Sequence, residues 1–359
     1  MVDSKQAPLD SAAAAKAAFA SVQDKPFPDD IFTAPELRWA VIGCGVIANQ
    51  MAQSLALAGR KLAGVANRTL SKAQAFAEQY GIEKVYESVE GLYADPGIDA
   101  VYITTPHNTH ITYLRDALAA GKHVLCEKAI TLNSAELDEA RAIADEHNVV
   151  LMDATTVLHM PLYQELRRRM DAGEFGRMNL AQLNFGSYKE YGDLTNRFYN
   201  RNLAGGAMLD IGVYALSVMR LFMASQPIEV VSLGNTCETG VDVAGGIVCR
   251  NAEQQLGVVS LTLHSKQPKR SIISFDKCYI EVNEYPRADH ATIVWTADGH
   301  REEVHAGTEA YALCYEMADL EKAVAGDDSK RELLGYASDV MELMTKLRAD
   351  WGVVYPEEE

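Results

Sequence analysis

An apolar stretch that ends in closely spaced glycines and leads into a helix-prone segment constrains this chain more than any other feature. Residues 38–45 read RWAVIGCG, and residues 47–59 read IANQMAQSLALAG. The first pattern predicts a buried strand, and the second predicts a helix that ends near Gly59. A glycine turn between a strand and a helix favours a sheet whose strands are linked by helices.

The same alternation of strand and helix patterns continues along the first half of the chain. Further segments of the two kinds alternate at 61–68, 71–81, 99–106, 109–121, 122–129, 134–148 and 149–155. Asn133 and Glu136 have the spacing of a capping box ahead of the helix at 134–148. Regular alternation predicts a parallel, doubly wound sheet, with a ligand bound at the carboxyl ends of its strands.

Gly43, Gly45 and Ala48 form a G-x-G-x-x-A triplet between the first strand and the first helix. In that position, Gly43 allows a tight turn, Gly45 lets the backbone approach a pyrophosphate, and Ala48 permits close packing of helix on strand. The free N–H groups of the helix N-terminus suit the same anion. The triplet therefore predicts a dinucleotide-binding domain of the Rossmann type, and a plain turn is the alternative.

After residue 175 the pattern changes to strands with short connections. These strand patterns lie at 178–188, 228–238, 245–251, 255–265, 270–276, 278–284 and 290–298, and helical patterns return at 309–326 and 332–350. They predict an α+β domain with a large, mostly antiparallel open sheet. We expect an N-terminal arm (1–36), a dinucleotide-binding domain (37–157) and a domain for substrate binding and oligomerisation (158–359).

Composition disfavours several classes of protein. The 359-residue chain has a formal net charge of −17, which argues against partners such as nucleic acid or anionic membranes. No apolar run approaches the ~20 residues that span a bilayer. The six scattered cysteines form no CxxC pair and favour a reducing cytoplasm. Asp3 and Lys16 argue against a signal peptide in the alanine-rich arm.

The end of the second strand distinguishes between nicotinamide cofactors. An NAD enzyme usually has an acidic residue there, which binds the ribose hydroxyls. This chain has Asn67 and Arg68, followed one helical turn later by Lys72. A guanidinium without a carboxylate suits a 2′-phosphate, and it could also stack on the adenine. The sequence predicts NADP, with NAD as the second choice; a solvated surface arginine is the alternative.

Two further segments carry candidate catalytic groups. Glu127 and Lys128 end a predicted parallel strand, so they should face the crevice. A partly desolvated lysine there can hydrogen-bond a substrate oxygen as hydride leaves. In LAGGAMLDIGVYAL (203–216), Asp210 and Tyr214 have the i, i+4 spacing that places both on one face of an apolar helix.

Together these motifs resemble the Gfo/Idh/MocA family, which includes glucose–fructose oxidoreductase and inositol dehydrogenase. The matching stretches are RWAVIGCGVIA (38–48), ITTPHNTHITYLRDALAAGKHVLCEKAITLN (103–133), AGGAMLDIGVY (204–214) and KLRADWGVVYP (346–356). A tyrosine at position 214, where other members have histidine, resembles the branch that holds trans-dihydrodiol dehydrogenases and NADP-linked D-xylose dehydrogenases. The Ala-Asn-Arg sequence that ends at Arg68 fits the NADP preference of that branch.

The resemblance implies roles for individual residues. Lys128 matches the lysine of the family's Glu-Lys-Pro motif, which contacts substrate and nicotinamide, and Asp210 and Tyr214 match the polar pair of the second motif. The expected cofactor contacts are Gly43, Gly45, Val46, Ile47, Asn67, Arg68, Thr104, Thr105, Asn108, His110, Glu127 and Lys128. Tyr214 is expected to act as general base, Lys128 to lower the pKa of its phenol, and Asp210 to orient the pair.

One residue departs from the family pattern. Ala129 replaces the proline that usually follows the lysine. A cis bond to a non-proline residue costs ~3 kcal/mol, so we expect a trans Lys128–Ala129 bond. His107 and His110 lack a carboxylate or cysteine partner at ligand spacing, so we expect no metal site. The aromatic and basic stretch at 187–201 is expected to form the rim of the substrate pocket.

Two classes of function remain open at this point. The first is an NADP-dependent oxidoreductase that transfers hydride between the nicotinamide and a CH–OH group of a sugar, polyol or cyclic diol. The second holds the cofactor without net redox turnover, as a glycosidase that works through transient oxidation or as a cofactor-sensing regulator. Because members of the family commonly bury the outer face of the open sheet against a second subunit, we also expect a homodimer or a tetramer of dimers.

Overall fold

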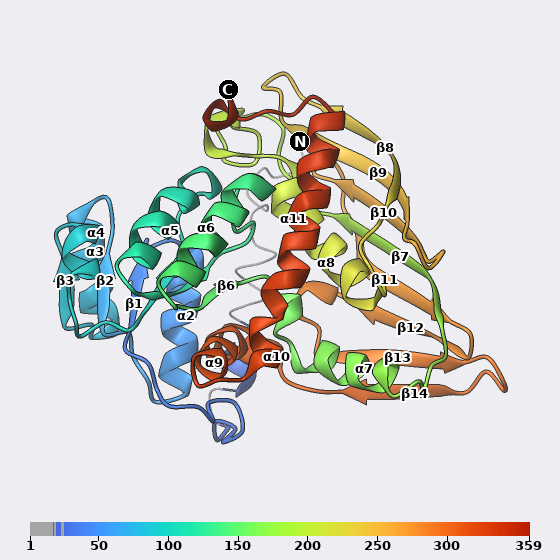
Figure 1. Cartoon of the computed structure of the whole chain (residues 1–359), viewed down its shortest axis with the longest axis horizontal. Coiled ribbons are helices and arrows are strands. Elements are labelled where there is room, and N and C mark those ends of the chain that lie inside the picture. Colours follow the sequence, from blue (N-terminus) through green and yellow to red (C-terminus); the bar gives the residue numbers. More distant parts are fainter. Residues whose placement is uncertain (1–16, 18, 23–24) are drawn as a thin grey trace, which may run out of the picture.

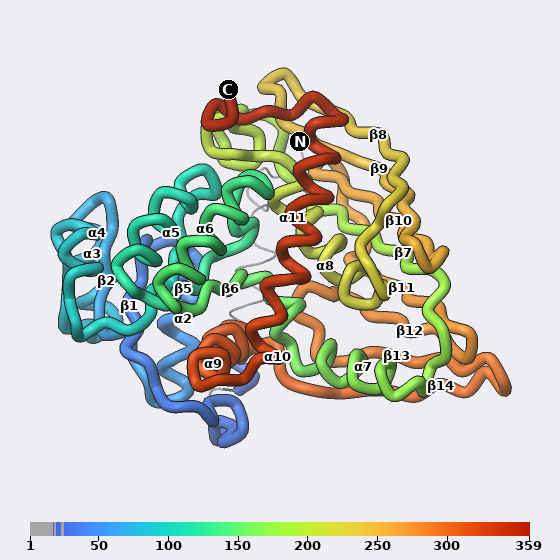
Figure 2. The backbone as a smooth tube through the Cα atoms, in the orientation of Figure 1, coloured from blue at the N-terminus to red at the C-terminus, as the bar shows by residue number. Residues whose placement is uncertain are grey.

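The computed structural model describes residue 17, residues 19–22 and residues 25–359, and it consists of two sheets with helices packed around them (Figure 1). Most of the N-terminal half of the predicted arm lies outside these residues. In Figures 1 and 2, the helix α11 (Leu333–Asp350) runs between the first domain and the second sheet. Its residues pack against helices of both domains, so α11 is part of the interface between them.

The first sheet is parallel and six-stranded, with the order β3-β2-β1-β4-β5-β6. Its strands are β1 (Trp39–Ile42), β2 (Gly64–Ala66), β3 (Lys84–Tyr86), β4 (Ala100–Ile103), β5 (His123–Cys126) and β6 (Leu151–Asp153). Every residue of β1 and β4 is buried, as expected for strands covered on both faces. The strand order reverses between β1 and β4, so the ligand crevice predicted for a doubly wound sheet lies at their carboxyl ends.

Helices cover both faces of this sheet. They are α2 (Val46–Leu57), α3 (Leu70–Tyr80), α4 (Val89–Tyr93), α5 (His110–Ala119) and α6 (Ser134–Glu146). The apolar side chains of α2 and α3 belong to one cluster and those of α5 and α6 to another. Asn133 caps α6 by accepting a hydrogen bond from the Glu136 N–H at 3.0 Å, as the capping-box spacing predicts. The sequence analysis missed β3 and α4, which are too short to show a clear periodicity.

The second sheet has eight strands in the order β14-β13-β12-β11-β7-β10-β9-β8. The strands are β7 (Met178–Gly186), β8 (Glu229–Thr236), β9 (Asp242–Arg250), β10 (Leu256–Thr262), β11 (Gln267–Phe275), β12 (Cys278–Asn283), β13 (His290–Trp295) and β14 (Arg301–His305). The pair of β7 and β10 is parallel and the other pairs are antiparallel. The predicted mostly antiparallel sheet is therefore confirmed. The helices α7 (Pro161–Asp171), α8 (Val213–Phe222) and α11 lie on one side of it (Figure 1).

The helix α9 (Ala312–Val324) comes late in the chain but packs in the first domain. Its residues Leu313, Met317 and Leu320 join the apolar cluster of α2 and α3. Its Glu321 carboxylate accepts hydrogen bonds from Trp39 Nε1 at 3.0 Å and Arg60 Nη2 at 2.5 Å. The sequence pattern at 309–326 did not predict this packing, because helix periodicity does not reveal which sheet a helix packs against.

The sequence analysis expects no apolar run long enough to span a bilayer, but one helical stretch passes that test by length and composition. Within the described residues, the helical stretch Arg201–Phe222 is long and apolar enough to span a bilayer by composition. However, 83% of its most apolar window is buried inside the protein. This stretch includes α8, whose apolar residues belong to the main core cluster.

Trp351 follows α11 and covers the edge of the second sheet at β8 and β9. Its Nε1 donates a hydrogen bond to Ser232 Oγ at 3.0 Å. Gly234 and Gly245 are cross-strand partners, and a Cβ atom on either would lie 2.2 or 2.3 Å from the indole ring. Both positions therefore need glycine, because the ring occupies the space of a side chain.

We predict that Gly245→Ala lowers the free energy of unfolding by about 1–3 kcal/mol, since the added methyl group would displace the indole. Gly246→Ala is the matched control on the same strand, because a Cβ there would meet nothing within 4 Å. The control should change stability by less than about 0.5 kcal/mol. Urea unfolding of the three proteins measures the difference, and equal midpoints would contradict the role of the indole.

Candidate active site

The glycine turn lies at the carboxyl end of β1, as the sequence predicts. Gly43 has a φ of +103°, and a Cβ atom on it would lie 2.7 Å from Thr104 Oγ1. Thr104 follows β4, and its hydroxyl donates a hydrogen bond to the Ile42 carbonyl at 3.1 Å. A Cβ atom on Gly45 would meet nothing within 4 Å, so the space in front of the α2 N-terminus is open.

This end of α2 fits the diphosphate of a dinucleotide. Gly45 is the N-cap, and α2 has neither a side-chain cap nor an acidic residue in its first turn. Its first N–H groups are therefore free to bind an anion. Val46 is 65% exposed at the start of the helix, and Ile47 beside it is half-buried. Residues 43–47 thus offer both hydrogen-bond donors and an apolar surface at the crevice.

Asn67 and Arg68 follow β2 at the same edge of the sheet. The Asn67 amide donates a hydrogen bond to the Thr69 carbonyl at 3.0 Å and so shapes the turn into α3. Arg68 is exposed, and no hydrogen bond or ion pair joins it to another residue of the described chain. Lys72 lies near the glycine turn, close enough for its charge to act on the Cys44 thiol. Burial raises the pKa of that thiol to about 11, and the charge of Lys72 opposes the shift.

Lys128, Asp210 and Tyr214 meet although they come from different domains. Lys128 Nζ donates a hydrogen bond to the Asp210 carbonyl at 2.7 Å and lies 3.2 Å from Asp210 Oδ1. The same ammonium is 4.9 Å from the centroid of the Tyr214 ring. The structure therefore brings together the three residues that the sequence predicts as catalytic.

The helix that carries Asp210 begins with a π-helical turn, Met208–Gly212, where the i, i+4 spacing predicts a regular helix. Asp242 accepts a hydrogen bond from the Met208 N–H at 2.6 Å and holds the start of this turn. Gly206 has a φ of +126°, and a Cβ atom on it would lie 2.3 Å from Asp242 Oδ1. Single π turns are frequent at functional sites, and here the turn presents Asp210 to Lys128.

Burial and charge shift the pKa values of this group in different ways. Burial raises the pKa of Asp210, but the positive charges of Lys128 and Arg197 outweigh it and leave that pKa well below its usual range. Burial lowers the pKa of Lys128, but the charge of Asp210 outweighs it and the net shift is upward. The lysine and the aspartate are therefore both ionised at neutral pH.

Lys128 lowers the pKa of the Tyr214 phenol, as expected, but the net shift of that pKa is upward. Burial raises the pKa of the Tyr214 phenol, and the nearby ammonium of Lys128 offsets this shift only in part. A phenolate without full solvation is costly, so the buried side chain keeps its proton. Tyr214 is therefore a hydrogen-bond donor at neutral pH.

The Lys128–Ala129 peptide bond is cis, which corrects the expectation of a trans bond. His107 Nε2 lies 3.1 Å from the Lys128 carbonyl, and His110 Nδ1 lies 3.0 Å from the Ala129 carbonyl. Ala129 itself has no exposed surface. These tertiary contacts fix the backbone at this point. The expectation of a trans bond rested on the residue type at position 129 alone and did not take such contacts into account.

His107 and His110 hold the loop after β4. Their remaining ring nitrogens face the Ala204 carbonyl at 3.3 Å and the Thr105 carbonyl at 2.8 Å. Burial lowers the pKa of both imidazoles, that of His107 to about 3. A neutral imidazole has one N–H, so each neutral ring donates to one of its two carbonyl neighbours. His110 has no exposed surface, which does not support its predicted contact with a cofactor.

Thr105 and Asn108 lie on the same loop, near the second domain. Thr105 Oγ1 accepts a hydrogen bond from the Thr109 hydroxyl at 2.8 Å. The Asn108 amide donates to the Asn202 carbonyl at 3.2 Å and to Glu357 Oε1 at 2.7 Å. Its carbonyl oxygen is buried and has no partner in the described part of the chain. Asn108 thus ties the loop to the second domain and keeps a free acceptor.

A pair of buried carboxylates lies behind Lys128, and the sequence analysis missed one of them. Glu127 accepts a hydrogen bond from the Tyr102 hydroxyl. Glu316 of α9 is fully buried, and neither carboxylate oxygen has a hydrogen-bond partner among the residues described. Burial raises the pKa of both, and together with the charge of Glu127 it raises that of Glu316 to about 8. The sequence feature that could have indicated Glu316 is a carboxylate placed within the apolar helix pattern at 309–326.

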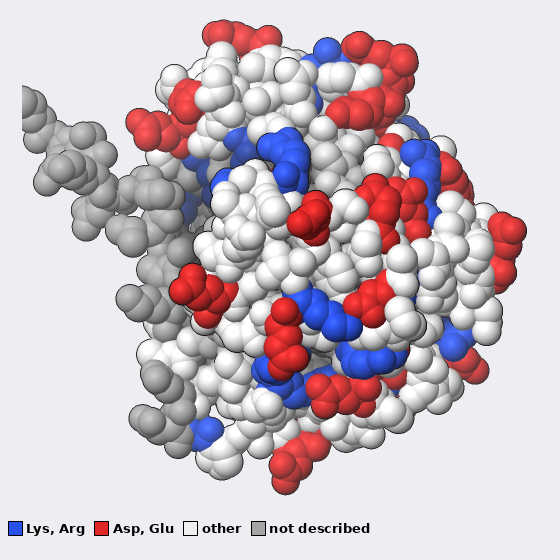
Figure 3. All heavy atoms as spheres, turned by 90° about the vertical axis from the view of Figure 1, so that its left-hand side faces the viewer, with Lys and Arg blue, Asp and Glu red and all other residues white. Residues whose placement is uncertain are grey.

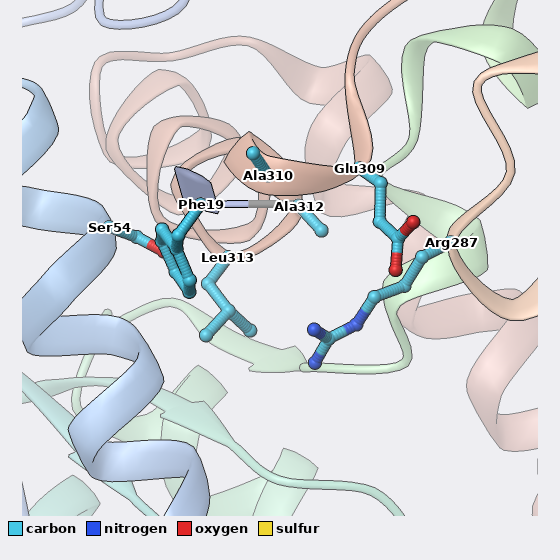
Figure 4. Close-up of a pocket in the computed structure, with 7 residues that line it drawn as sticks. All are labelled: Phe19, Ser54, Arg287, Glu309, Ala310, Ala312 and Leu313. Atoms are coloured by element: carbon cyan, nitrogen blue, oxygen red, sulfur yellow. The ribbon is translucent and has the colours of Figure 1, made fainter. Parts of the chain in front are cut away.

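Arg287 was also missed, and it links the second domain to α2. Its Nη1 donates a hydrogen bond to Gln50 Oε1 at 3.1 Å. Figure 4 shows its side chain extending beside Glu309 into a small pocket between α2 and the start of α9. The pocket is lined by Phe19, Ser54, Arg287, Glu309, Ala310, Ala312 and Leu313. Spacing along the sequence gave no signal for this contact between domains.

The fold is a doubly wound sheet with an open helix N-terminus, and a half-buried lysine and tyrosine meet a buried aspartate at the ends of its strands. This combination defines the class of nicotinamide-dependent oxidoreductases. Comparison with protein families agrees with this class. Residues 37–155 match the oxidoreductase family with an NAD-binding Rossmann fold, and residues 163–281 match the GFO/IDH/MocA C-terminal domain. The chain belongs to the Gfo/Idh/MocA family of oxidoreductases, as its motifs predict.

The names of similar proteins agree with this family, and similar solved structures agree with its fold. Trans-1,2-dihydrobenzene-1,2-diol dehydrogenase of Mus musculus is 32% identical over 69% of this chain and 75% of its own length. The Xenopus laevis enzyme of that name is 28% identical over 89% of this chain and 99% of its own length. A 3-ketoreductase from Actinomadura kijaniata, solved with NADP and TDP-benzene, is 24% identical and has a TM-score of 0.75 over 88% of this chain and 98% of its own. Levoglucosan dehydrogenase, solved with NADH and levoglucosan, is 19% identical with a TM-score of 0.75 over 86% of this chain and 97% of its own.

We predict that Glu316→Gln removes a pH-dependent loss of stability. The folded state holds a proton on Glu316 up to a pH of about 8, whereas the ordinary carboxyl pKa is 4.5. Between these values the folded state binds the extra proton, so the free energy of unfolding falls as the pH rises. The gain in stability from Glu316→Gln should therefore grow from pH 5 to pH 8 in urea unfolding.

Glu303→Gln is the control for this experiment, because Glu303 is exposed on β14. Its stability should follow that of the unchanged protein across the same pH range. If Glu316→Gln also gave a constant difference from pH 5 to pH 8, the buried carboxyl group would not hold the proton that we assign to it.

Proposed function

We propose that the protein is an NADP-dependent oxidoreductase that transfers hydride between the nicotinamide and a CH–OH carbon of a sugar, polyol or cyclic diol. The observation that carries this proposal is the meeting of Lys128, Asp210 and Tyr214. Lys128 follows β5 at the same edge of the sheet as the open N-terminus of α2, which follows β1. Relatives named as diol dehydrogenases, and similar folds solved with NADP and a nucleotide-linked ligand or with levoglucosan, support the substrate class.

In this proposal the chain's own groups hold the reacting oxygen and move its proton. The bound nicotinamide accepts or donates the hydride at its ring. Lys128 donates a hydrogen bond to the substrate oxygen, and Asp210 keeps that ammonium charged and oriented. Tyr214 gives its phenolic proton to the oxygen during reduction and receives it during oxidation. The raised pKa of Tyr214 suits the reduction at neutral pH and makes the oxidation favour higher pH.

We predict that Tyr214→Phe lowers kcat/KM about a hundredfold or more, the usual scale for losing an acid–base group. In the unchanged enzyme, oxidation should accelerate as the pH rises, because more of the phenol is ionised, and the variant should lose this dependence. The substrate is chosen from a panel of aldoses, polyols and diols by stoichiometric formation of NADPH.

Tyr113→Phe, in the first domain, serves as the control for the loss of a phenol. Affinity for NADP should remain near normal in Tyr214→Phe, since the phenol meets the substrate. Lys128→Met should lose rate and also some nicotinamide affinity. A Tyr214→Phe enzyme with normal turnover and an unchanged pH profile would exclude the assignment and make Lys128 the better candidate.

The preference for NADP is proposed from the groups that follow β2. Arg68 is exposed and unpaired within the described residues, and Lys72 lies near the same turn. A carboxylate that would bind the ribose hydroxyls of NAD is missing at the end of this strand.

Arg68→Ala is expected to weaken NADP binding by about 1.5–3 kcal/mol, the strength of a hydrogen bond to a charged group, while NAD binding changes little. Arg141→Ala, at an exposed position on α6, is the control. Titration of nicotinamide fluorescence with NADPH and NADH measures both affinities. Equal losses for the two cofactors would exclude a contact with the 2′-phosphate.

A homodimer through the second sheet is proposed from an apolar surface patch. Val231, Leu233, Val248 and Leu256 point to the outer face of β8, β9 and β10, and they are 75%, 83%, 47% and 41% exposed. An exposed apolar patch on a sheet of this size is typical of a protein–protein interface. A tetramer built from such dimers is compatible with the same patch.

Leu233→Asp should convert the dimer to a monomer, because it places a charge in the centre of the patch. Sedimentation velocity at micromolar concentration measures the mass, which is 39.3 kDa for one chain. Lys346→Asp, at an exposed position on α11, should leave the dimer intact. A stable monomer of the unchanged protein would refute the proposal.

A further inference from the structure

Cationic side chains gather on the substrate side of Asp210. Lys128 Nζ lies 3.2 Å and Arg197 Nη2 lies 3.5 Å from the same oxygen, Asp210 Oδ1. The Asp210 side chain is 12% exposed and the Arg197 side chain is 59% exposed, so the cluster extends from the buried pair to the surface. One carboxylate thus faces two positive charges in a chain whose formal net charge is −17.

Lys189 adds a third positive charge without an anionic partner. Its ammonium and the Arg197 guanidinium each lie 4.3 Å from the centroid of the Phe198 ring. No hydrogen bond or ion pair joins that ammonium to any residue that the structure describes. The Lys189 backbone is fixed, because its carbonyl accepts a hydrogen bond from the Tyr199 hydroxyl at 2.9 Å. The shared contact with the Phe198 ring brings the Lys189 ammonium near Arg197.

The surroundings of Lys189 show that its charge is not compensated. Burial lowers its pKa, and the neighbouring charges of Arg197, Lys128 and Lys269 lower it further, against the opposing effect of Asp210. Lys269 is itself paired with Glu284 at 2.9 Å, so the carboxylate of Glu284 is already engaged. A partly buried ammonium with only cations and a shared carboxylate nearby is costly unless a further anion binds.

The other carboxylates near Lys128 do not fill this role. Glu127 accepts a hydrogen bond from Tyr102 in the first domain, and Glu316 is fully buried behind it. The open N-terminus of α2, which fits the cofactor diphosphate, belongs to the first domain, whereas Lys189 and Arg197 lie on the segment after β7. On the face drawn in Figure 3, basic and acidic side chains alternate in the lower part of the view, and several basic side chains lie together in its upper left part.

We propose that the substrate carries an anionic group, a carboxylate or a phosphate, which Lys189 and Arg197 bind while the reacting carbon faces Lys128 and Tyr214. This inference rests on the proposed function and specifies its substrate class as acidic or phosphorylated sugars. Arg197 then exchanges part of its contact with Asp210 for the bound anion. Lys189 gains the partner that it lacks within the protein.

Binding and turnover of matched compounds test the proposal. Glucose, glucuronate, glucose 6-phosphate and UDP-glucose are titrated into the full-length protein with and without NADPH, followed by protein fluorescence. At least one anionic compound should bind ten times more tightly than glucose, and added salt should weaken its binding. The preferred compound identifies the source of the anion. Tighter binding of glucose than of all three anionic compounds would overturn the proposal.

Lys189→Gln should weaken binding of the anionic compound about tenfold or more and change glucose binding little, and in turnover its loss should appear in KM, with kcat changed little. Arg197→Gln should weaken binding of the anionic compound as well, but because Arg197 also contacts Asp210, a fall in its kcat is expected too. Lys346→Gln, at an exposed position on α11, is the control. If the variants weaken NADPH binding instead, the cations serve the cofactor and the proposal fails. If anions bind as expected but no sugar in the wider panel reduces NADP, the proposed function fails and the anion site stands.

Discussion

The ion pair between Lys128 and Asp210 is the contact on which the arrangement of the site depends. It joins a residue that follows the first sheet to one that precedes α8, and both side chains are about one-eighth exposed. Removing one partner from a buried pair leaves an uncompensated charge, which typically costs about 3–5 kcal/mol. Backbone contacts fix both ends: His107 and His110 hold the carbonyls beside Lys128, and Asp242 holds the turn that carries Asp210.

Two buried carboxyl groups near this pair illustrate how the environment decides protonation. Asp210 meets positive charges, which outweigh the effect of burial, so it stays ionised. At Glu316, burial and the charge of Glu127 outweigh the opposing effects of His159 and Arg287, so the carboxyl group keeps a proton. Carboxyl groups with similar intrinsic acidity thus differ because their neighbours differ in charge. The ionised one lies at the substrate side, and the neutral one lies in the core behind Lys128.

Sequence patterns predicted positions correctly where these follow from local spacing. The glycine turn, the lysine just after β5 and the spacing of Asp210 and Tyr214 each lie within a short segment. In the structure Lys128, Asp210 and Tyr214 come together. Sequence patterns failed where a property depends on residues distant in sequence. The cis bond at Lys128–Ala129, the raised pKa of Tyr214 and the contact of Arg287 with Gln50 all arise from tertiary packing.

The position of α9 has a consequence for the way in which the chain acquires its structure during synthesis. The first domain's strands end at Asp153, but its apolar core also needs Leu313, Met317 and Leu320, and Glu321 binds the side chains of Trp39 and Arg60. When only the segment that forms the first sheet has emerged from the ribosome, α9 of that core has therefore not yet been synthesised. Domains of many proteins fold in order as they emerge, but here the first domain must wait for the second to be translated. The core of the first domain is therefore completed only after the residues of α9 have been made, which follow all the strands of the second sheet.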